Sequence, residues 1–268
     1  MNYTRPFFFL VPFLLLNAIL IAQPQTKSIL GIENAEMVDR LMLRVPGTSV
    51  TDNANLREQS IKPYMMPVRR AEGNHTNESY LLASCLEYYV NLNKNYKVNL
   101  SPDFIALNLQ SQGKLVDFKS AFQLMAETGT VSAAIMPYGS PRLTAAVYAT
   151  QKFKISNYLI LFRSVTKPRQ KIFELRKALV RGNPVIVELN VDEQFQNAYA
   201  RNTVELSNQS KQQMAVLVVG FDQEKEAFEI SSPYGTAWGK GGYIWVSYAD
   251  LARQSTAAYV MVPEMKLY

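Results

Sequence analysis

The stretch from Ser231 to Tyr248, "SSPYGTAWGKGGYIWVSY", constrains the fold more than any other part of the chain. It contains four glycines and both tryptophans of the sequence. Glycines at this density favour tight turns, and "YIWVSY" has the aromatic and β-branched residues of a strand. Because the glycines lead into a strand and not a helix, they do not match a phosphate-binding loop. The stretch therefore predicts a turn that packs against aromatic side chains and continues into a buried strand.

Composition limits the possible functions. The chain has 268 residues, and 48% of them are hydrophobic, which is enough for one large core or two smaller ones. The formal net charge of +6 is spread along the sequence, without the clustered basic face of a nucleic-acid-binding protein. One histidine and one cysteine are too few for a zinc site. We therefore expect no nucleic acid, no metal and no cofactor.

Residues 1–22 have the features of a secretory signal peptide. Arg5 precedes an apolar run from Pro6 to Ala22, and a polar segment follows. The alternative is a membrane anchor, but an apolar run with two prolines is short for a span of about twenty residues. We expect cleavage near Ala22, export to the periplasm, the cell surface or the extracellular space, and no membrane attachment afterwards. An exported chain with only Cys85 has no internal disulfide and depends on its core.

Helical patterns precede strand patterns along the rest of the chain. We expect a polar extension over residues 23–59, a helical lobe over residues 60–150 and a β-rich lobe over residues 151–268. The expected helices are Ala35–Leu43, Asn77–Asn91, Pro102–Gln112, Asp117–Thr128 and Pro168–Gly182, and the expected strands are Tyr158–Phe162, Pro184–Val191, Met214–Asp222, Ala227–Gly235 and Gly242–Tyr248. This order predicts an α+β protein with two lobes.

Several motifs resemble one family in their order and spacing. They are "PYMMPVRRAEGNHTNESYLLASCLEYYV", "LSPDFIAL", "AIMPYGS", "ALVRGNPVIVELNV", "QQMAVLVVGFD" and the stretch that starts at Ser231. Together they resemble the papain-like cysteine peptidases, in particular the bacterial secreted members, from about Ile61 to Pro263. The resemblance implies a helical lobe with a central helix and a second lobe built on an antiparallel, β-barrel-like sheet.

The same resemblance places the family's catalytic roles on four residues that cannot perform them. Family members use a thiolate at the start of the central helix, a histidine that exchanges its proton, an asparagine that orients the histidine, and an upstream glutamine that binds the oxyanion. In this sequence the nucleophile position falls on Asn77, the base on Met214, the orienting residue on Ser232 and the oxyanion residue on Ala71. The resemblance therefore implies an inactive member of the family.

Three functions remain open from the sequence. In the first, the protein binds a peptide or protein partner in the cleft between the lobes, and His75, Glu78 and Trp238 are the expected cleft-lining residues. In the second, it is a divergent peptidase that uses Cys85, or a hydrolase that uses His75. Cys85, however, follows the expected start of its helix by eight residues, roughly 12 Å, which favours a core position. In the third, it is a structural subunit of an exported assembly.

Overall fold

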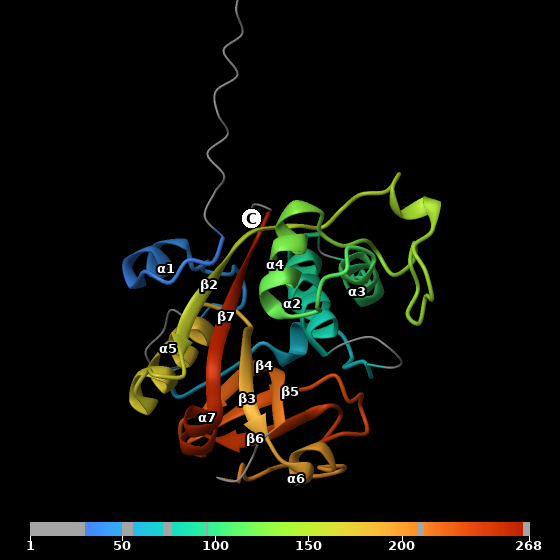
Figure 1. Ribbon diagram of the computed structural model, residues 1–268. Helices are drawn as coiled ribbons and strands as arrows, with labels where there is room; N and C mark the ends of the chain where they lie inside the picture. The colour runs from blue at the N-terminus through green and yellow to red at the C-terminus, as the bar shows by residue number, and fades with distance from the viewer. Residues whose placement is uncertain (1–29, 50–55, 72–76, 95, 208–211, 265–268) are drawn as a thin grey trace, which may run out of the picture.

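One antiparallel sheet runs through both lobes of the molecule (Figure 1). The computed structural model describes residues 30–49, 56–71, 77–94, 96–207 and 212–264. The strands are β1 Glu58–Ser60, β2 Ile155–Arg163, β3 Val185–Val191, β4 Gln212–Asp222, β5 Ala227–Ser231, β6 Tyr243–Ser247 and β7 Ser255–Pro263. Their order is β2-β7-β3-β4-β5-β6, and β1 also pairs with β4, beyond the end of the β3 pairing. The expected α+β class is confirmed.

The central strand β4 separates two hydrophobic cores. Ala215, Leu217 and Val219 belong to the core that includes the helical lobe. The alternate residues Met214, Val216 and Val218 belong to the core of the β-rich lobe. Successive side chains of a strand point to opposite faces of the sheet, so an uninterrupted apolar run can supply both cores. This explains why "MAVLVVGF" lacks the alternation of a strand with one face in water.

The helical lobe is built around α2 Asn77–Lys94, which is apolar on most of its surface and is therefore surrounded by other elements. It contacts α3 Pro102–Ser111, α4 Phe118–Glu127 and the face of the sheet formed by β4 and β7. Side chains fix the starts of the two flanking helices: Ser101 accepts a hydrogen bond from the N–H of Phe104, and Asp117 accepts one from that of Ser120. The cap at Asp117 fixes the start of α4, which packs against β2.

The β-rich lobe covers the opposite face of the sheet with α5 Pro168–Val180 and α7 Tyr248–Gln254 (Figure 1). A short helix, α6 Glu193–Gln196, follows β3. The sheet does not close into the barrel that the resemblance implied, because other segments cover both of its edges. Ile32 hydrogen-bonds to Tyr158 and Ile160 of β2, and residues 202–204 hydrogen-bond to Trp245 of β6. The described strands β2 and β6 therefore do not pair with each other.

Described parts of the predicted N-terminal extension are integrated into the fold. Helix α1, expected over Ala35–Leu43, covers Ala35–Leu41 and packs against β2. Val45 is fully buried, and its N–H donates to the carbonyl of Arg181. Two short 3-10 helices, Lys62–Tyr64 and Ala145–Val147, complete the described elements. The predicted signal peptide, residues 1–22, lies outside the described residues, and within the described ranges no helix is long and apolar enough to cross a membrane.

Candidate functional site

The N-terminal end of α2 lies at the junction of the two lobes. Asn77, which the sequence resemblance assigns to the family's nucleophile position, is the first residue of this helix and is half-buried. Its neighbour Glu78 lines a cavity that the helical lobe shares with the sheet. The preceding residues 72–76, which include the candidate His75, lie outside the described part of the chain. Glu78, one of the residues that the sequence places in the cleft, thus lines a cavity between the two lobes.

The cavity beside Glu78, here called the inter-lobe cavity, has a volume of about 340 Å³. Its walls come from the starts of α2 and α4 on one side and from β3, β4 and β7 on the other. The lining residues are Glu78, Val116, Asp117, Phe118, Lys119, Glu188, Gln213, Met214, Ala215 and Tyr259. This volume is at the lower end of ligand cavities, which span about 300–1,000 Å³.

Acidic side chains dominate the charge of the inter-lobe cavity. Glu188 accepts a hydrogen bond from the hydroxyl of Tyr259 at 2.6 Å and another from the amide of Gln213 at 2.9 Å. Burial, together with the hydrogen bond to Glu188, raises the pKa of Tyr259, so this hydroxyl remains a donor. Three carboxylates, Glu78, Asp117 and Glu188, face one ammonium group, Lys119. Acidic residues therefore outnumber basic ones in the lining of the cavity.

Met214, which the sequence resemblance assigns to the family's base position, lies on β4 and lines this cavity. It is only 6% exposed, and the hydroxyl of Tyr234 donates a hydrogen bond to its sulfur at 3.4 Å. A thioether is a weak acceptor and carries no exchangeable proton. Glu78 and Met214 line the same cavity, so the structure brings the start of α2 and the base position together.

Ala71 and Ser232, which the sequence resemblance assigns to the oxyanion and orienting positions, lie on two segments that are joined by hydrogen bonds. The N–H of Ala71 donates to the carbonyl of Pro233 at 2.8 Å, and Arg70 pairs with Tyr234 in a β-bridge. Ser232 is 1% exposed, and its hydroxyl has no hydrogen-bond partner among the described residues. A methyl group cannot bind an oxyanion, and a serine this deeply buried presents no group to the inter-lobe cavity.

Cys85 is a core residue, as the sequence indicated. It is fully buried within the core that includes the helical lobe, and its thiol is free. Burial raises the pKa of this thiol, whereas a nucleophilic cysteine needs a lowered pKa and access to substrate. The structure therefore places the Cys85 thiol in the core, and Cys85 is not among the residues that line the inter-lobe cavity.

Trp238 does not line the cleft, and this corrects the sequence prediction. Its side chain is fully buried, its Nε1–H donates to the carbonyl of Phe195 at 2.7 Å, and its ring contacts those of Phe195 and Tyr234. The glycine-rich stretch places this ring in the core of the β-rich lobe, which fits the structural role predicted for the glycines.

Most of the residues that line the inter-lobe cavity were not predicted from the sequence. Glu188, Gln213 and Tyr259 come from three neighbouring strands, and their proximity follows from the pairing of β3 with both β4 and β7. One signal was present: Glu188 is the only charged residue in "PVIVELNV". A carboxylate in an otherwise apolar strand needs a partner or a ligand. Among the residues that the structure describes, no group of three or more side chains is suited to hold a metal ion.

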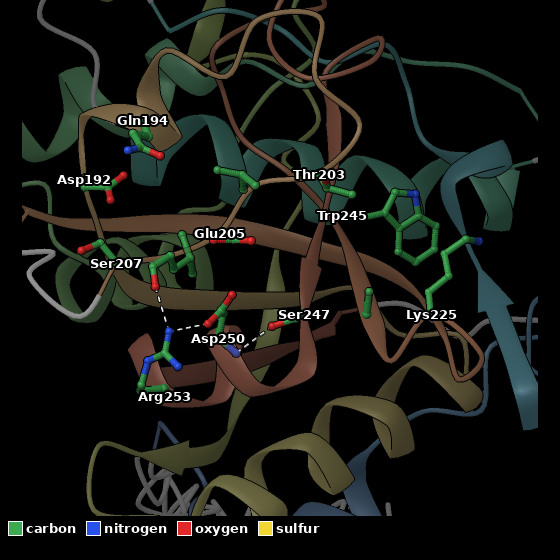
Figure 2. A pocket seen from close by; sticks show the side chains of 13 residues that line it. Asp192, Gln194, Thr203, Glu205, Ser207, Lys225, Trp245, Ser247, Asp250 and Arg253 are labelled. Atoms are coloured by element: carbon green, nitrogen blue, oxygen red, sulfur yellow. Dashed lines mark hydrogen bonds and ion pairs between the residues drawn. The ribbon is translucent and has the colours of Figure 1, made fainter.

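A second cavity, of about 800 Å³, lies in the β-rich lobe beside α6, β6 and α7 (Figure 2). Its two basic side chains are already in ion pairs, Arg253 with Asp250 and Lys225 with Asp222, and Lys225 also lies 4.7 Å from the ring centre of Trp245. None of its lining residues is shared with the inter-lobe cavity, and none is a family catalytic position. It is therefore separate from the candidate site.

Solved structures of cysteine proteases share this fold. Xylellain, a cysteine protease from Xylella fastidiosa, is 17% identical with a TM-score of 0.62, covering 80% of this chain and 90% of its own. Digestive procathepsin L 3 from Tenebrio molitor is 19% identical with a TM-score of 0.64, covering 85% and 78%. Bromelain from Ananas comosus is 16% identical with a TM-score of 0.61, covering 77% and 98%. At these identities the likeness establishes the fold alone.

The sequence also matches a family model. No curated protein matches the chain, but the model of the papain family cysteine proteases matches residues 86–262. The match includes Met214 and Ser232 and begins inside α2, after Asn77 and Cys85. The start of the central helix, where the family carries its nucleophile, is therefore outside the matched segment. Since the model covers most of the sequence, the chain belongs to the papain family of cysteine proteases.

Proposed function

We propose that this protein is an exported, non-catalytic member of the papain family that binds a polypeptide segment in the inter-lobe cavity. The observation that carries the proposal is the position of the single cysteine. Cys85 is fully buried, and the start of α2 carries Asn77. The side-chain amide of asparagine does not form the covalent acyl intermediate that a thiolate forms.

The other expected positions support the same conclusion. Met214 cannot accept a proton from a nucleophile, and Ala71 supplies no side-chain donor for an oxyanion. The predicted signal peptide over residues 1–22 supports export. The frame around these replacements is retained, including the inter-lobe cavity and its ordered hydrogen bonds at Glu188. A retained cavity without catalytic groups favours binding over hydrolysis.

The acidic lining of the cavity favours a segment with a basic side chain. A lysine or arginine inserted between Glu78, Asp117 and Glu188 would find three carboxylates within the same hollow. Tyr259 and Gln213 hold the carboxylate of Glu188 in one orientation, which lowers the entropic cost of binding.

The absence of catalysis is tested by incubation with broad peptide substrates and with a thiol-reactive peptide probe. We expect neither turnover nor covalent labelling, while an active papain-family enzyme under the same conditions gives both. Thiol-dependent hydrolysis that disappears in Cys85→Ala would overturn the proposal.

Binding is tested with peptides that differ only in one central lysine, glutamate or alanine. We expect the lysine peptide to bind best, and Glu188→Gln to weaken its binding about tenfold. Glu193→Gln, an exposed residue on α6 outside the cavity, is the matched control and should leave the affinity unchanged. Equal affinity for the three peptides, or an equal loss in both variants, would contradict binding in this cavity.

A further inference from the structure

Helix α5 has a second stripe of side chains that the core does not use. Its core stripe includes Leu175, Ala178 and Leu179. The other stripe is spaced as i, i+3, i+4, i+7 and i+8, which places its members on one side of a helix. These members are Phe173, Arg176, Lys177, Val180 and Arg181, and with Arg44 and Leu56 they line a hollow of about 310 Å³, here called the α5 groove. Figure 1 shows α5 on the side of the sheet away from α2.

Apolar side chains line part of the α5 groove. Phe173 is 58% exposed and Leu56 is 37% exposed, and Val180 is half-buried between them and the core. Exposed apolar surface costs free energy in water, and a hollow lined by such residues marks an interaction site. An aromatic side chain is a common anchor in such sites.

The α5 groove carries more positive than negative charges. Lys177 is bound by Asp39 at 2.7 Å and by Glu174 at 2.6 Å, and Arg181 is 3.8 Å from the same Asp39. These two cations and two carboxylates balance one another.

The remaining two arginines have no carboxylate partner among the described residues. Arg176 donates to the carbonyl of Leu56 at 3.2 Å and to the side-chain amide oxygen of Gln223 at 3.1 Å, and its buried Nε has no hydrogen-bond partner. Arg44 is exposed. An arginine guanidinium can bind a carboxylate with two parallel hydrogen bonds, which suits the exposed Arg44, and Arg176 adds a second positive charge to the same groove.

We propose that the α5 groove is a docking site for an acidic polypeptide segment of a partner protein. An aliphatic or aromatic side chain of that segment rests against Phe173 and Leu56, and carboxylates beside it bind Arg44 and Arg176. The groove shares no lining residue with the inter-lobe cavity, so this inference does not depend on the proposed function of that cavity.

The shape of the site favours a peptide over an anionic membrane surface. A helix that binds a bilayer interface buries an apolar face in it, whereas Phe173 and Leu56 line a hollow together with arginine side chains. The hydrogen bond from Arg176 to the carbonyl of Leu56 holds the two walls together. A preformed concave site of this kind suits single side chains of a bound segment.

The test is a selection from a random peptide library on the immobilised full chain. We expect enriched peptides to combine aspartate or glutamate with a leucine, isoleucine or aromatic residue. In fluorescence anisotropy, Phe173→Ser and Arg44→Glu should each weaken the best peptide about tenfold or more, and added salt should weaken it further.

Two variants act as matched controls. Val165→Ser removes an apolar side chain that is 92% exposed outside the groove, and Arg142→Glu reverses an exposed charge in the helical lobe, away from α5. Both should bind like the unmodified chain, as should Glu188→Gln. Enrichment of basic or uncharged peptides, or an equal loss in Arg142→Glu and Arg44→Glu, would overturn the proposal. So would binding to phosphatidylglycerol vesicles that depends on Phe173 and Arg44 when no acidic peptide is enriched.

Discussion

The hydroxyl of Tyr234 lies 3.4 Å from the sulfur of Met214 and donates a hydrogen bond to it. Tyr234 belongs to the glycine-rich stretch and Met214 to β4, so the contact joins two segments that carry expected catalytic positions. Burial raises the pKa of Tyr234 to about 12, so at neutral pH this hydroxyl is protonated. Neither partner of this contact can therefore accept a proton from a nucleophile.

The contact suggests a direct test of the residue assignment. A cysteine in Asn77→Cys would lie at the start of α2, and a histidine in Met214→His would lie on the opposite wall of the cavity that Glu78 lines. If both assignments are correct, the imidazolium lowers the pKa of the new thiol. We expect the double variant to react with iodoacetamide at pH 6 about tenfold faster than Asn77→Cys alone, measured by mass spectrometry.

The control for this test is Asn77→Cys combined with Met214→Leu, which changes the same wall without adding a base. It should react like the single variant. Identical rates and pH dependences in all three variants would show that Asn77 and Met214 do not face each other, and the assignment of the catalytic positions would be wrong.

Cys85 should be unreactive in the native protein. It is fully buried and its pKa is raised, so thiol reagents should label it only after unfolding in denaturant. Cys85→Ser places a hydroxyl in an apolar core and should lower the free energy of unfolding by about 1–3 kcal/mol, measured by urea denaturation. Rapid labelling in native buffer would contradict the buried position.

The sequence predicted the fold where local patterns were strong. The helix expected over Asn77–Asn91 spans Asn77–Lys94, and the predicted starts of α3 and α4 agree with the caps at Ser101 and Asp117. Apolar periodicity and capping residues are local signals, and here the tertiary structure agrees with them.

Features that depend on distant pairing were not predictable in the same way. Strand β7 and the short strand β1 were both missed, although β7 supplies Tyr259 to the inter-lobe cavity. The open sheet depends on Ile32, which covers the edge of β2 from more than a hundred residues away. Such contacts are set by the register of the sheet, and no local pattern encodes them.

A buried ion pair joins the loop before the oxyanion position to α2. Glu87 is 1% exposed, binds Arg69 through one oxygen and accepts the N–H of Leu100 at 2.7 Å through the other. Glu87→Ala leaves the guanidinium of Arg69, whose side chain is 15% exposed, without its charge partner. We expect a loss of about 3–5 kcal/mol in the free energy of unfolding, whereas the exposed control Glu36→Ala should have almost no effect.

The same pair predicts a pH dependence. Burial raises the pKa of Glu87 above its ordinary value of 4.5, although Arg69 opposes the shift. Because its pKa is raised in the folded state, Glu87 holds its proton more firmly there than in the unfolded chain. Its contribution to stability therefore falls as pH rises from about 4.5 to the folded-state pKa. The stability difference between the unmodified chain and Glu87→Gln should therefore decrease as pH rises above 4.5. Urea denaturation at several pH values measures it, and an increasing difference would contradict the direction.

Substitutions at two glycines of the stretch that starts at Ser231 distinguish the free-energy cost of backbone strain from the cost of steric overlap. Gly239 and Gly241 both have positive φ angles, +57° and +67°. A Cβ atom at Gly239 would collide with the carbonyl of Tyr243, whereas a Cβ atom at Gly241 would meet nothing within 4 Å. Gly241→Ala should therefore cost only the strain of a left-handed residue, about 1–2 kcal/mol. Gly239→Ala should cost about 1–3 kcal/mol more, because the turn must shift to relieve the overlap.

Urea unfolding midpoints of the two variants decide between these effects. Equal losses would mean that the turn yields freely at Gly239, and the stretch would then not fix the position of Trp238 as the structure indicates.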